Sequence, residues 1–412
     1  MSTDHMHDLV RGSLDNCVKC TICETYCPVS AATPLFPGPK YVGPQAERFR
    51  GDGPSPDDSL TWCSSCGICT HVCPQGVKIA EINSLAKAEM AAERGIPLRD
   101  RLISRPTLAG RLGAPVAPLA NRLARNRLLR AAVERTLGIH RKAALPAWAG
   151  RTFQSRTRLR RLPPGRPGER PAVVYFHGCA ANYYETHTAE MAVRVLEMQG
   201  LDVIVPRQGC CGLPLQSNGL YPAARHYVRD LARTLAPYAR TGHDIVSTST
   251  SCGLMLKREA REILGMEDDD DLRAVSGRLY DICEYLALMH ERGELRTDLL
   301  TPLDMDAPYH APCQLRGHGV GTPAMELMQL IPGLRPRQVD AVCCGVAGTY
   351  GLKREKYDVA MAVGEPVFDQ VRESGAELSV CDSETCRWHI AEATGVPSVH
   401  PVALLHRSYG LG

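Results

Sequence analysis

The C-terminal half of the chain carries the same arrangement of four cysteines twice. Each copy has a single cysteine, then an adjacent Cys-Cys pair followed by glycine, then another single cysteine. Corresponding cysteines of the two copies are separated by 134, 133 and 134 residues, and so constant an offset indicates an internal duplication. We therefore expect two units of one fold. The cysteines are Cys179, Cys210, Cys211 and Cys252 in the first copy and Cys313, Cys343, Cys344 and Cys386 in the second.

Short β-rich runs precede the cysteines of each copy, and segments of helical period follow the runs. Residues 172–179, AVVYFHGC, and residues 243–250, HDIVSTST, are two such runs, and residues 185–200 have helical period. Strands that alternate with helices predict a parallel sheet, whose ligands bind beyond the carboxyl ends of the strands. Because the cysteines fall at those ends, three loops can bring the four thiols of a copy together.

A redox or metal site explains each group of four cysteines better than buried free thiols do. A single buried cysteine is common and needs no function. Eight cysteines repeated in register are a poor fit to that explanation. Cys283 and Cys381 have no counterpart in the other copy, so we expect them to be structural.

Two cysteine runs near the N-terminus have the spacing C-x₂-C-x₂-C-x₃-C-P, which is typical of [4Fe–4S] clusters in bacterial ferredoxins. In that motif three cysteines wrap one cluster, and the fourth reaches the other cluster. Structural zinc sites instead typically use two separated Cys-x₂-Cys pairs. We expect one cluster on Cys17, Cys20, Cys23 and Cys73, and a second on Cys63, Cys66, Cys69 and Cys27.

The formal net charge of +3 hides a strongly basic segment. Between Arg99 and Arg170 there are 18 Lys and Arg residues against 3 Asp and Glu. Leucines stand among the arginines of residues 114–138, as in amphipathic helices that lie on anionic membranes. Packing against an acidic partner subunit explains the segment equally well. Nucleic-acid binding is not expected, because no DNA- or RNA-binding motif accompanies the basic residues.

These features predict a mainly helical two-cluster ferredoxin-like domain followed by two tandem α/β cysteine-rich domains with parallel sheets. No basic-then-apolar leader and no apolar run of about 18 residues occurs, so we expect neither secretion nor a transmembrane helix. Residues 29–62, between the two cysteine runs, read as an inserted surface loop that docks a partner. The predicted regions are 1–97 (ferredoxin-like), 98–170 (basic connector), 171–300 (first Cys-Cys-Gly domain) and 301–412 (second Cys-Cys-Gly domain).

In combination, the motifs resemble the iron–sulfur subunits of flavin dehydrogenases and of heterodisulfide reductases. They are most similar to the C-subunit family of anaerobic glycerol-3-phosphate dehydrogenases. The specific matches include PLFPGPKYVGP at 34–44, CCGLPLQSNG at 210–219 and CCGVAGTYGLK at 343–353. The resemblance extends over nearly the whole chain.

The resemblance implies an electron-transfer subunit that binds no substrate of the dehydrogenase itself. Separate flavin-containing subunits would oxidise sn-glycerol 3-phosphate, and this chain would pass the electrons to membrane quinone, menaquinone in particular. It also implies peripheral attachment to the cytoplasmic face of the inner membrane, for which the basic connector is a candidate. The alternatives are the iron–sulfur subunit of a lactate or glycolate oxidase, a catalytic subunit of heterodisulfide-reductase type, and a structural or zinc-binding scaffold.

One departure from the relatives concerns the last motif of each copy. Relatives that hold a noncubane cluster have Cys-x₂-Cys there, whereas this chain has Ser249 and Ser383 at the first position. Four thiols still suit an iron–sulfur cluster, a hydroxyl is an atypical ligand, and loss of one or both clusters is equally open. His177 and His310 precede the first cysteine of each copy; we expect them to hydrogen-bond a cluster sulfur or a quinone carbonyl, or to be structural.

Overall fold

The first Cys-Cys-Gly domain is built on a four-stranded sheet in the order β2-β1-β3-β4, with every neighbouring pair parallel. This computed structural model describes residues 4–50, 57–157 and 171–411. Residues 173–176 of the central strand are all buried, as expected for a strand covered on both faces. The strands are β1 (Ala172–Phe176), β2 (Asp202–Ile204), β3 (Asp244–Ser247) and β4 (Leu279–Asp281).

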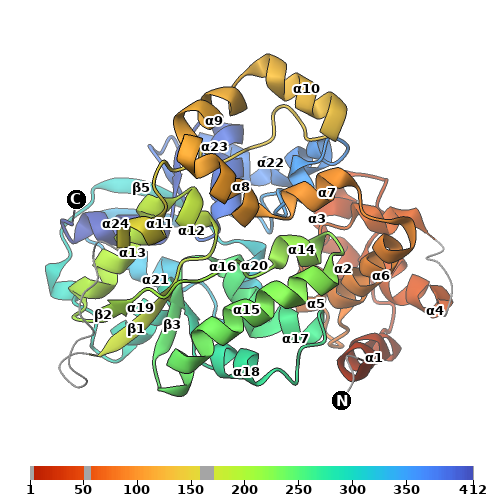
Figure 1. The fold of residues 1–412 in the computed structure, drawn as a ribbon, viewed down its shortest axis with the longest axis horizontal. Helices are drawn as coiled ribbons and strands as arrows, with labels where there is room; N and C mark the ends of the chain where they lie inside the picture. The colour runs from red at the N-terminus through yellow and green to blue at the C-terminus, as the bar shows by residue number, and fades with distance from the viewer. Residues whose placement is uncertain (1–3, 51–56, 158–170, 412) are drawn as a thin grey trace.

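Eight α-helices and a π-helical turn accompany this sheet in the described part of the chain (Figure 1). The longest follows the Cys-Cys pair and packs against the helix that precedes β4. They are α12 (Ala180–Tyr183), α13 (Thr186–Met198), α14 (Leu213–Ser217), α15 (Tyr221–Arg240), α16 (Thr250–Leu254), η6 (Met255–Glu259), α17 (Ala260–Glu262), α18 (Asp270–Ser276) and, after β4, α19 (Ile282–Glu291), which leads toward the second domain.

The second Cys-Cys-Gly domain repeats the arrangement in the order β6-β5-β7-β8, again all parallel. The predicted duplication of a parallel α/β unit is therefore confirmed. Its elements are β5 (Met305–His310), α20 (Cys313–His318), α21 (Pro323–Gln329), β6 (Leu334–Gln338), α22 (Tyr357–Glu373), β7 (Ser379–Cys381), α23 (Glu384–Thr394), β8 (Ser398–Val399) and α24 (Pro401–Ser408).

The two Cys-Cys-Gly domains share one apolar core. Tyr175 and Leu196 of the first domain belong to the same buried cluster as Tyr309, Leu327 and Leu404 of the second. Helix α13 packs on α24, and α19 packs on α21. Because this interface is a continuous core, the carboxyl ends of the two sheets are held in a fixed relation.

The N-terminal region is mainly helical, as predicted, and packs against both domains. Ile82 and Leu85 of α6 share a buried cluster with Leu231 of α15, and Phe36 shares another with Val359 of α22. Its α-helices are α1 (Asp4–Gly12), α2 (Ile22–Thr25), α3 (Pro28–Ala32), α4 (Ala46–Arg50), α5 (Ile68–His71) and α6 (Ile79–Arg94).

The segment 29–62 is more than the predicted surface loop. Besides α3 and α4 it contains a π-helical turn η2 (Tyr41–Gln45) and a 3₁₀ turn η3 (Asp58–Trp62). Val29, Phe36 and Leu60 are buried. Apolar side chains spaced irregularly in a Pro- and Gly-rich stretch give no periodic signal, so the sequence did not reveal that they pack inward.

The described part of the predicted basic connector forms five short α-helices, and the first four lie across the upper part of the view in Figure 1. Prolines at the first turn of α8 and α9, and the N-cap Asn126 before α10, divide it into separate segments. In the described residues no helix has both the length and the apolar character needed to cross a bilayer. The predicted basic stretch at 158–170 lies outside the described residues. The helices are α7 (Leu98–Ile103), α8 (Pro106–Gly113), α9 (Ala117–Ala124) and α10 (Arg127–Leu137); α11 (Phe153–Thr157) follows them.

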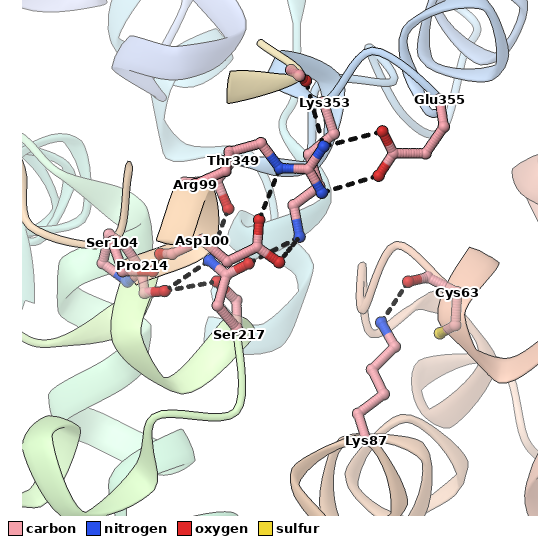
Figure 2. A network of polar contacts seen from close by, with 12 residues as sticks. Cys63, Lys87, Arg99, Asp100, Ser104, Pro214, Ser217, Thr349, Lys353 and Glu355 are labelled. Carbon is pink, nitrogen blue, oxygen red and sulfur yellow. Dashed lines mark hydrogen bonds and ion pairs between the residues drawn. The ribbon is translucent and has the colours of Figure 1, made fainter. Parts of the chain in front are cut away.

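A network of ion pairs joins α7 to both Cys-Cys-Gly domains (Figure 2). Arg99 donates to both carboxylate oxygens of Glu355, at 2.9 and 2.8 Å. Lys353 donates to Asp100 at 2.9 Å and to Asn218 at 2.9 Å. Asn218 belongs to the first domain and Lys353 to the second, so this junction fixes the connector over the place where the domains meet.

Candidate metal centres

Four cysteines from the two ferredoxin runs surround one small cavity, called site A here. The loop between the first two cysteines and the helix α2 turns back through left-handed residues, Lys19 with φ 59° and Thr21 with φ 66°. The fourth cysteine follows α5 of the second run. Four thiols around one space are the donor set that a [4Fe–4S] cluster takes. Site A consists of Cys17, Cys20, Cys23 and Cys73.

The reciprocal set, site B, surrounds a second small cavity. Ser65 with φ 56° and Gly67 with φ 79° turn the loop in the same way as at site A. The structure therefore brings the fourth cysteine of each run to the first three of the other run, as the spacing predicted. That these sets hold the clusters remains our prediction. Site B consists of Cys27, Cys63, Cys66 and Cys69.

Site B is the more enclosed of the two, and a lysine lies beside it (Figure 2). Lys87 donates to the carbonyl oxygen of Cys63 and, at 3.1 Å, to Ser65 Oγ. Burial lowers the pKa of Lys87, and the nearby Cys63 thiol opposes that effect. Burial raises the pKa of Cys66, and the neighbouring Cys343 raises it further. Burial therefore disfavours free thiolates at Cys66.

The first Cys-Cys-Gly domain brings its four thiols together, as predicted, at the carboxyl ends of its strands; this is site C. Cys211 Sγ lies 3.1 Å from Cys252 Sγ. Hydrogen bonds from Cys179 and then Cys211 lower the pKa of Cys210 well below its ordinary value. Gly212 has φ +80° and starts α14, and a Cβ there would lie 3.0 Å from the Ala224 carbonyl oxygen. Site C consists of Cys179, Cys210, Cys211 and Cys252.

The second domain assembles the equivalent site D, with two additional groups. Hydrogen bonds from Cys344 and Cys381 lower the pKa of Cys386 well below its ordinary value. Sequence reasoning classed Cys381 as structural; the structure places its thiol against Cys386. The potential ligand atoms of His310, Cys344 and Cys386 all lie within 4.8 Å of one another, and all three residues are buried. Site D consists of Cys313, Cys343, Cys344 and Cys386.

The two histidines singled out from the sequence have different surroundings. His177 Nδ1 lies 2.6 Å from the Gly178 carbonyl oxygen, and its ring packs edge-on against Phe153 with centroids 5.5 Å apart. This favours the structural alternative. His310 instead lies beside Cys386 and helps to lower its pKa, and its buried ring nitrogens have no nitrogen or oxygen partner. A buried imidazole whose polar neighbours are thiols fits a ligand or a hydrogen-bond donor to a bound centre.

The two serines at the fifth-ligand positions also differ. Ser249 Oγ donates to Glu384 Oε1 at 3.0 Å, across the boundary between the two domains. Ser383 Oγ lies 3.4 Å from Thr385 Oγ1. Ser249 is thus engaged in joining the domains. Four thiols in each site still fit an iron–sulfur centre, which takes soft sulfur donors.

Sites C and D open into one cavity of about 360 Å³, which Cys66 of site B also lines. The sequence located each set of thiols at the ends of its own strands. It did not reveal that both sets face the same space, because a duplication says nothing about how the copies are oriented.

Comparison with known proteins agrees with this description. The family described as 4Fe-4S dicluster domain matches residues 13–77, and the one described as Cysteine-rich domain matches residues 173–257 and 307–391. The chain is 35% identical over 398 residues to the C-subunit of the anaerobic glycerol-3-phosphate dehydrogenase of Escherichia coli K12, covering 95% of this chain and 98% of that protein. It is 24% identical to the D-subunit of the dihydromethanophenazine:CoB–CoM heterodisulfide reductase of Methanosarcina barkeri, covering 92% of this chain and 88% of that one. It is 25% identical to the B-subunit of the fumarate reductase (CoM/CoB) of Methanothermobacter marburgensis, covering 92% of this chain and 68% of that one.

Proposed function

This chain belongs to the C-subunit family of anaerobic glycerol-3-phosphate dehydrogenases, and we propose that it is the component that carries electrons from flavin-containing partners to membrane quinone. The observation that supports the proposal is the series of cysteine sites, which runs from the exposed site A through site B to the cavity shared by sites C and D. Iron–sulfur clusters supply single-electron steps between a flavin and a quinone.

The flavin-containing partner docks at site A. Cys20 is exposed there, whereas Cys23 of the same site is buried. Apolar side chains that line the site are open to solvent, with Val18 64% and Ile22 37% exposed. Clustered exposed apolar groups of this kind are typical of protein interfaces. Lys40, which also lines site A, belongs to the segment 29–62, and this agrees with the docking role expected for that segment.

Site B passes the electrons onward to the Cys-Cys-Gly domains. Cys66 lies close enough to Cys343 of site D for each thiol to influence the charge of the other. Val359 and Val363 of α22 share a buried cluster with Cys63 of site B, so the second domain is packed directly against it. Site B thus adjoins the second domain and the shared cavity, which supports a path for electrons from the partner through sites A and B.

The connector attaches the complex to the cytoplasmic face of the membrane. Leu112 is 68% exposed and Leu119 is 60% exposed, on helices that also carry exposed arginines. Apolar side chains next to basic ones suit an interface of acyl chains and anionic headgroups. Peripheral attachment of this kind needs no membrane-spanning helix.

Anaerobic reconstitution tests the electron-transfer role. The full chain, loaded with iron and sulfide, is combined with its flavin subunits, and reduction of a naphthoquinone by glycerol 3-phosphate is followed. We expect quinone reduction only with the chain present, while the flavin subunits alone reduce an artificial dye. Equal quinone reduction without the chain contradicts the proposal, and turnover only with lactate or glycolate subunits supports the alternative substrate class.

Vesicle sedimentation tests the attachment. Leu112→Glu and Leu119→Glu should release the chain from anionic vesicles, because a charge replaces the inserted apolar group. Leu299→Glu is the matched control, since Leu299 is also exposed but lies in the segment between the two Cys-Cys-Gly domains. Equal release by all three variants contradicts a membrane-binding role of the connector.

A further inference from the structure

Part of the lining of the cavity shared by sites C and D does not belong to any of the cysteine sites. Thiols of both sites and of site B form one part of it. The opposite part is formed by the connector, through Leu102, Pro106, Ala109, Leu145 and Trp148. The connector therefore closes over the redox centres of both domains instead of merely linking them to the ferredoxin-like region.

The connector part of the lining is also open to the outside. Leu102 is 45% exposed and Leu145 is 41% exposed, although both line the cavity, so they lie at its rim. Leu102 is in α7, and the exposed Leu108 and Leu112 follow in α8. The apolar rim thus continues into the surface proposed above to touch the membrane.

The size and chemistry of the cavity suit an apolar ring. Its volume of about 360 Å³ falls within the range of small-molecule sites, about 300–1,000 Å³. Centres held at sites C and D would occupy the thiol-lined part, which leaves the part lined by Pro106, Ala109, Trp148 and Tyr184 for a ligand. Flat aromatic ligands stack well on Trp and Tyr rings.

We propose that this cavity binds the quinone that accepts the electrons, with its ring between the connector and sites C and D and its tail directed along the exposed leucines of α7 and α8. The inference rests on the proposed function and adds the location of the acceptor. An anionic disulfide substrate is the competing occupant. Arg258 and Arg316 line the cavity and would attract such an anion, whereas the apolar lining and rim formed by the connector favour the quinone.

Reduction of the quinone in this cavity needs a source of electrons and a source of protons. A quinone becomes a quinol by taking up two electrons and two protons. The electrons come from oxidation of glycerol 3-phosphate in the flavin subunits, and clusters held by the cysteines of sites A and B would supply the one-electron steps to the cavity. The protons come from solvent, which reaches the cavity at the exposed rim.

Photolabelling tests the location. The complete complex, without membranes, is illuminated with a tailless azido-naphthoquinone, and labelled peptides are mapped by mass spectrometry. Labels are expected on the connector around Trp148 and on α14. Ala109→Trp and Ser217→Trp block the cavity from two different walls and should each reduce labelling about tenfold or more. Thr107→Trp, which adds the same ring to the same helix outside the lining, should leave labelling unchanged.

Iron content shows that each variant still holds its centres, and reduction of those centres by glycerol 3-phosphate, followed by electron paramagnetic resonance, shows that the variant receives electrons from the flavin subunits. Unchanged labelling in both blocking variants, or labels mapped elsewhere while quinone reduction persists, overturns the cavity site and leaves the proposed function intact. Competition for the label by a disulfide, together with its reduction, assigns the cavity to that substrate instead. Absence of quinone reduction in the unmodified complex refutes the proposed function, and this inference with it.

Discussion

Lys353 Nζ lies 2.9 Å from Asp100 Oδ2 and so ties the second Cys-Cys-Gly domain to the first helix of the connector. Both side chains are largely buried, and Arg99 and Asn218 complete the network. Helix α7 also lines the cavity through Leu102, so this part of the cavity wall is held in place by charged hydrogen bonds. Such bonds are among the stronger polar interactions in proteins. The connector is therefore a fixed part of the folded body at α7.

Removing the carboxylate should weaken this junction. Asp100→Ala leaves the Lys353 ammonium short of a partner, and we expect a loss of about 1–3 kcal/mol in the free energy of unfolding. Denaturant unfolding measures the change. Asp58→Ala removes the exposed ion pair with Arg94 and should leave the unfolding midpoint unaltered. Equal midpoints for the two variants would show that the junction contributes nothing.

Double variants test the crossed ligand sets of sites A and B. Under the proposed pairing, Cys20→Ser with Cys73→Ser damages site A alone, whereas Cys66→Ser with Cys73→Ser damages both sites. Iron analysis and electron paramagnetic resonance of the reduced chain should show one ferredoxin cluster retained in the first variant and neither in the second. The reverse result, with both clusters lost in the first variant, would mean that each run binds its own cluster.

Ser249 offers a test of whether a hydroxyl serves as a ligand at site C. Because its Oγ donates to the buried Glu384, Ser249→Ala should lower stability by about 1–3 kcal/mol and leave the iron content unchanged. Ser383→Ala should have a smaller effect on stability, since its contact with Thr385 is long at 3.4 Å. Loss of iron from the Ser249 variant alone would identify the hydroxyl as a ligand.

The two glycines of the Cys-Cys-Gly motifs should not tolerate substitution equally. A Cβ at Gly345, which has φ +88°, would lie 1.9 Å from the Ala360 carbonyl oxygen, whereas at Gly212 the closest atom is the Ala224 carbonyl oxygen at 3.0 Å. We expect Gly345→Ala to abolish iron binding at site D or to prevent folding. Gly212→Ala should cost about 1–2 kcal/mol from its left-handed backbone alone. Thermal unfolding with iron analysis distinguishes these outcomes.

Glu259 should make stability depend on pH. Burial, and then Glu81, raise its pKa from 4.5 to about 8. The folded chain therefore keeps a proton that the unfolded chain releases, so stability should fall as pH rises from about 4.5 to about 8. Glu259→Gln should remove this part of the decline, measured as the unfolding midpoint at both ends of the range. An unchanged pH dependence would show that Glu259 titrates normally.

The parts of the structure that follow from local rules were predictable. Ferredoxin spacing brought the two cysteine runs together, and alternation of strands and helices placed Cys211 and Cys252 at the ends of parallel strands. Each rule involves residues that are close in sequence or repeated in register.

The relations between regions were not predictable, because they depend on shape complementarity between distant surfaces. The hydrogen bond from Ser249 to Glu384 and the shared cavity of sites C and D arise only when the two domains pack. The contact of Cys381 with Cys386 is local, and the sequence missed it for another reason: Cys381 has no counterpart in the first domain, so the duplication gave no signal for it.

The two partners of the ion pair between Asp100 and Lys353 are synthesised at different times. Asp100 leaves the ribosome 253 residues before its partner, which at about 5–20 residues per second is an interval of roughly 10–50 s. During that interval the connector lacks this anchor and depends on contacts with earlier parts of the chain, such as the hydrogen bond from Tyr184 Oη to the Pro106 carbonyl oxygen. The part of the cavity wall that the second domain contributes, with the thiols of site D, is therefore added last.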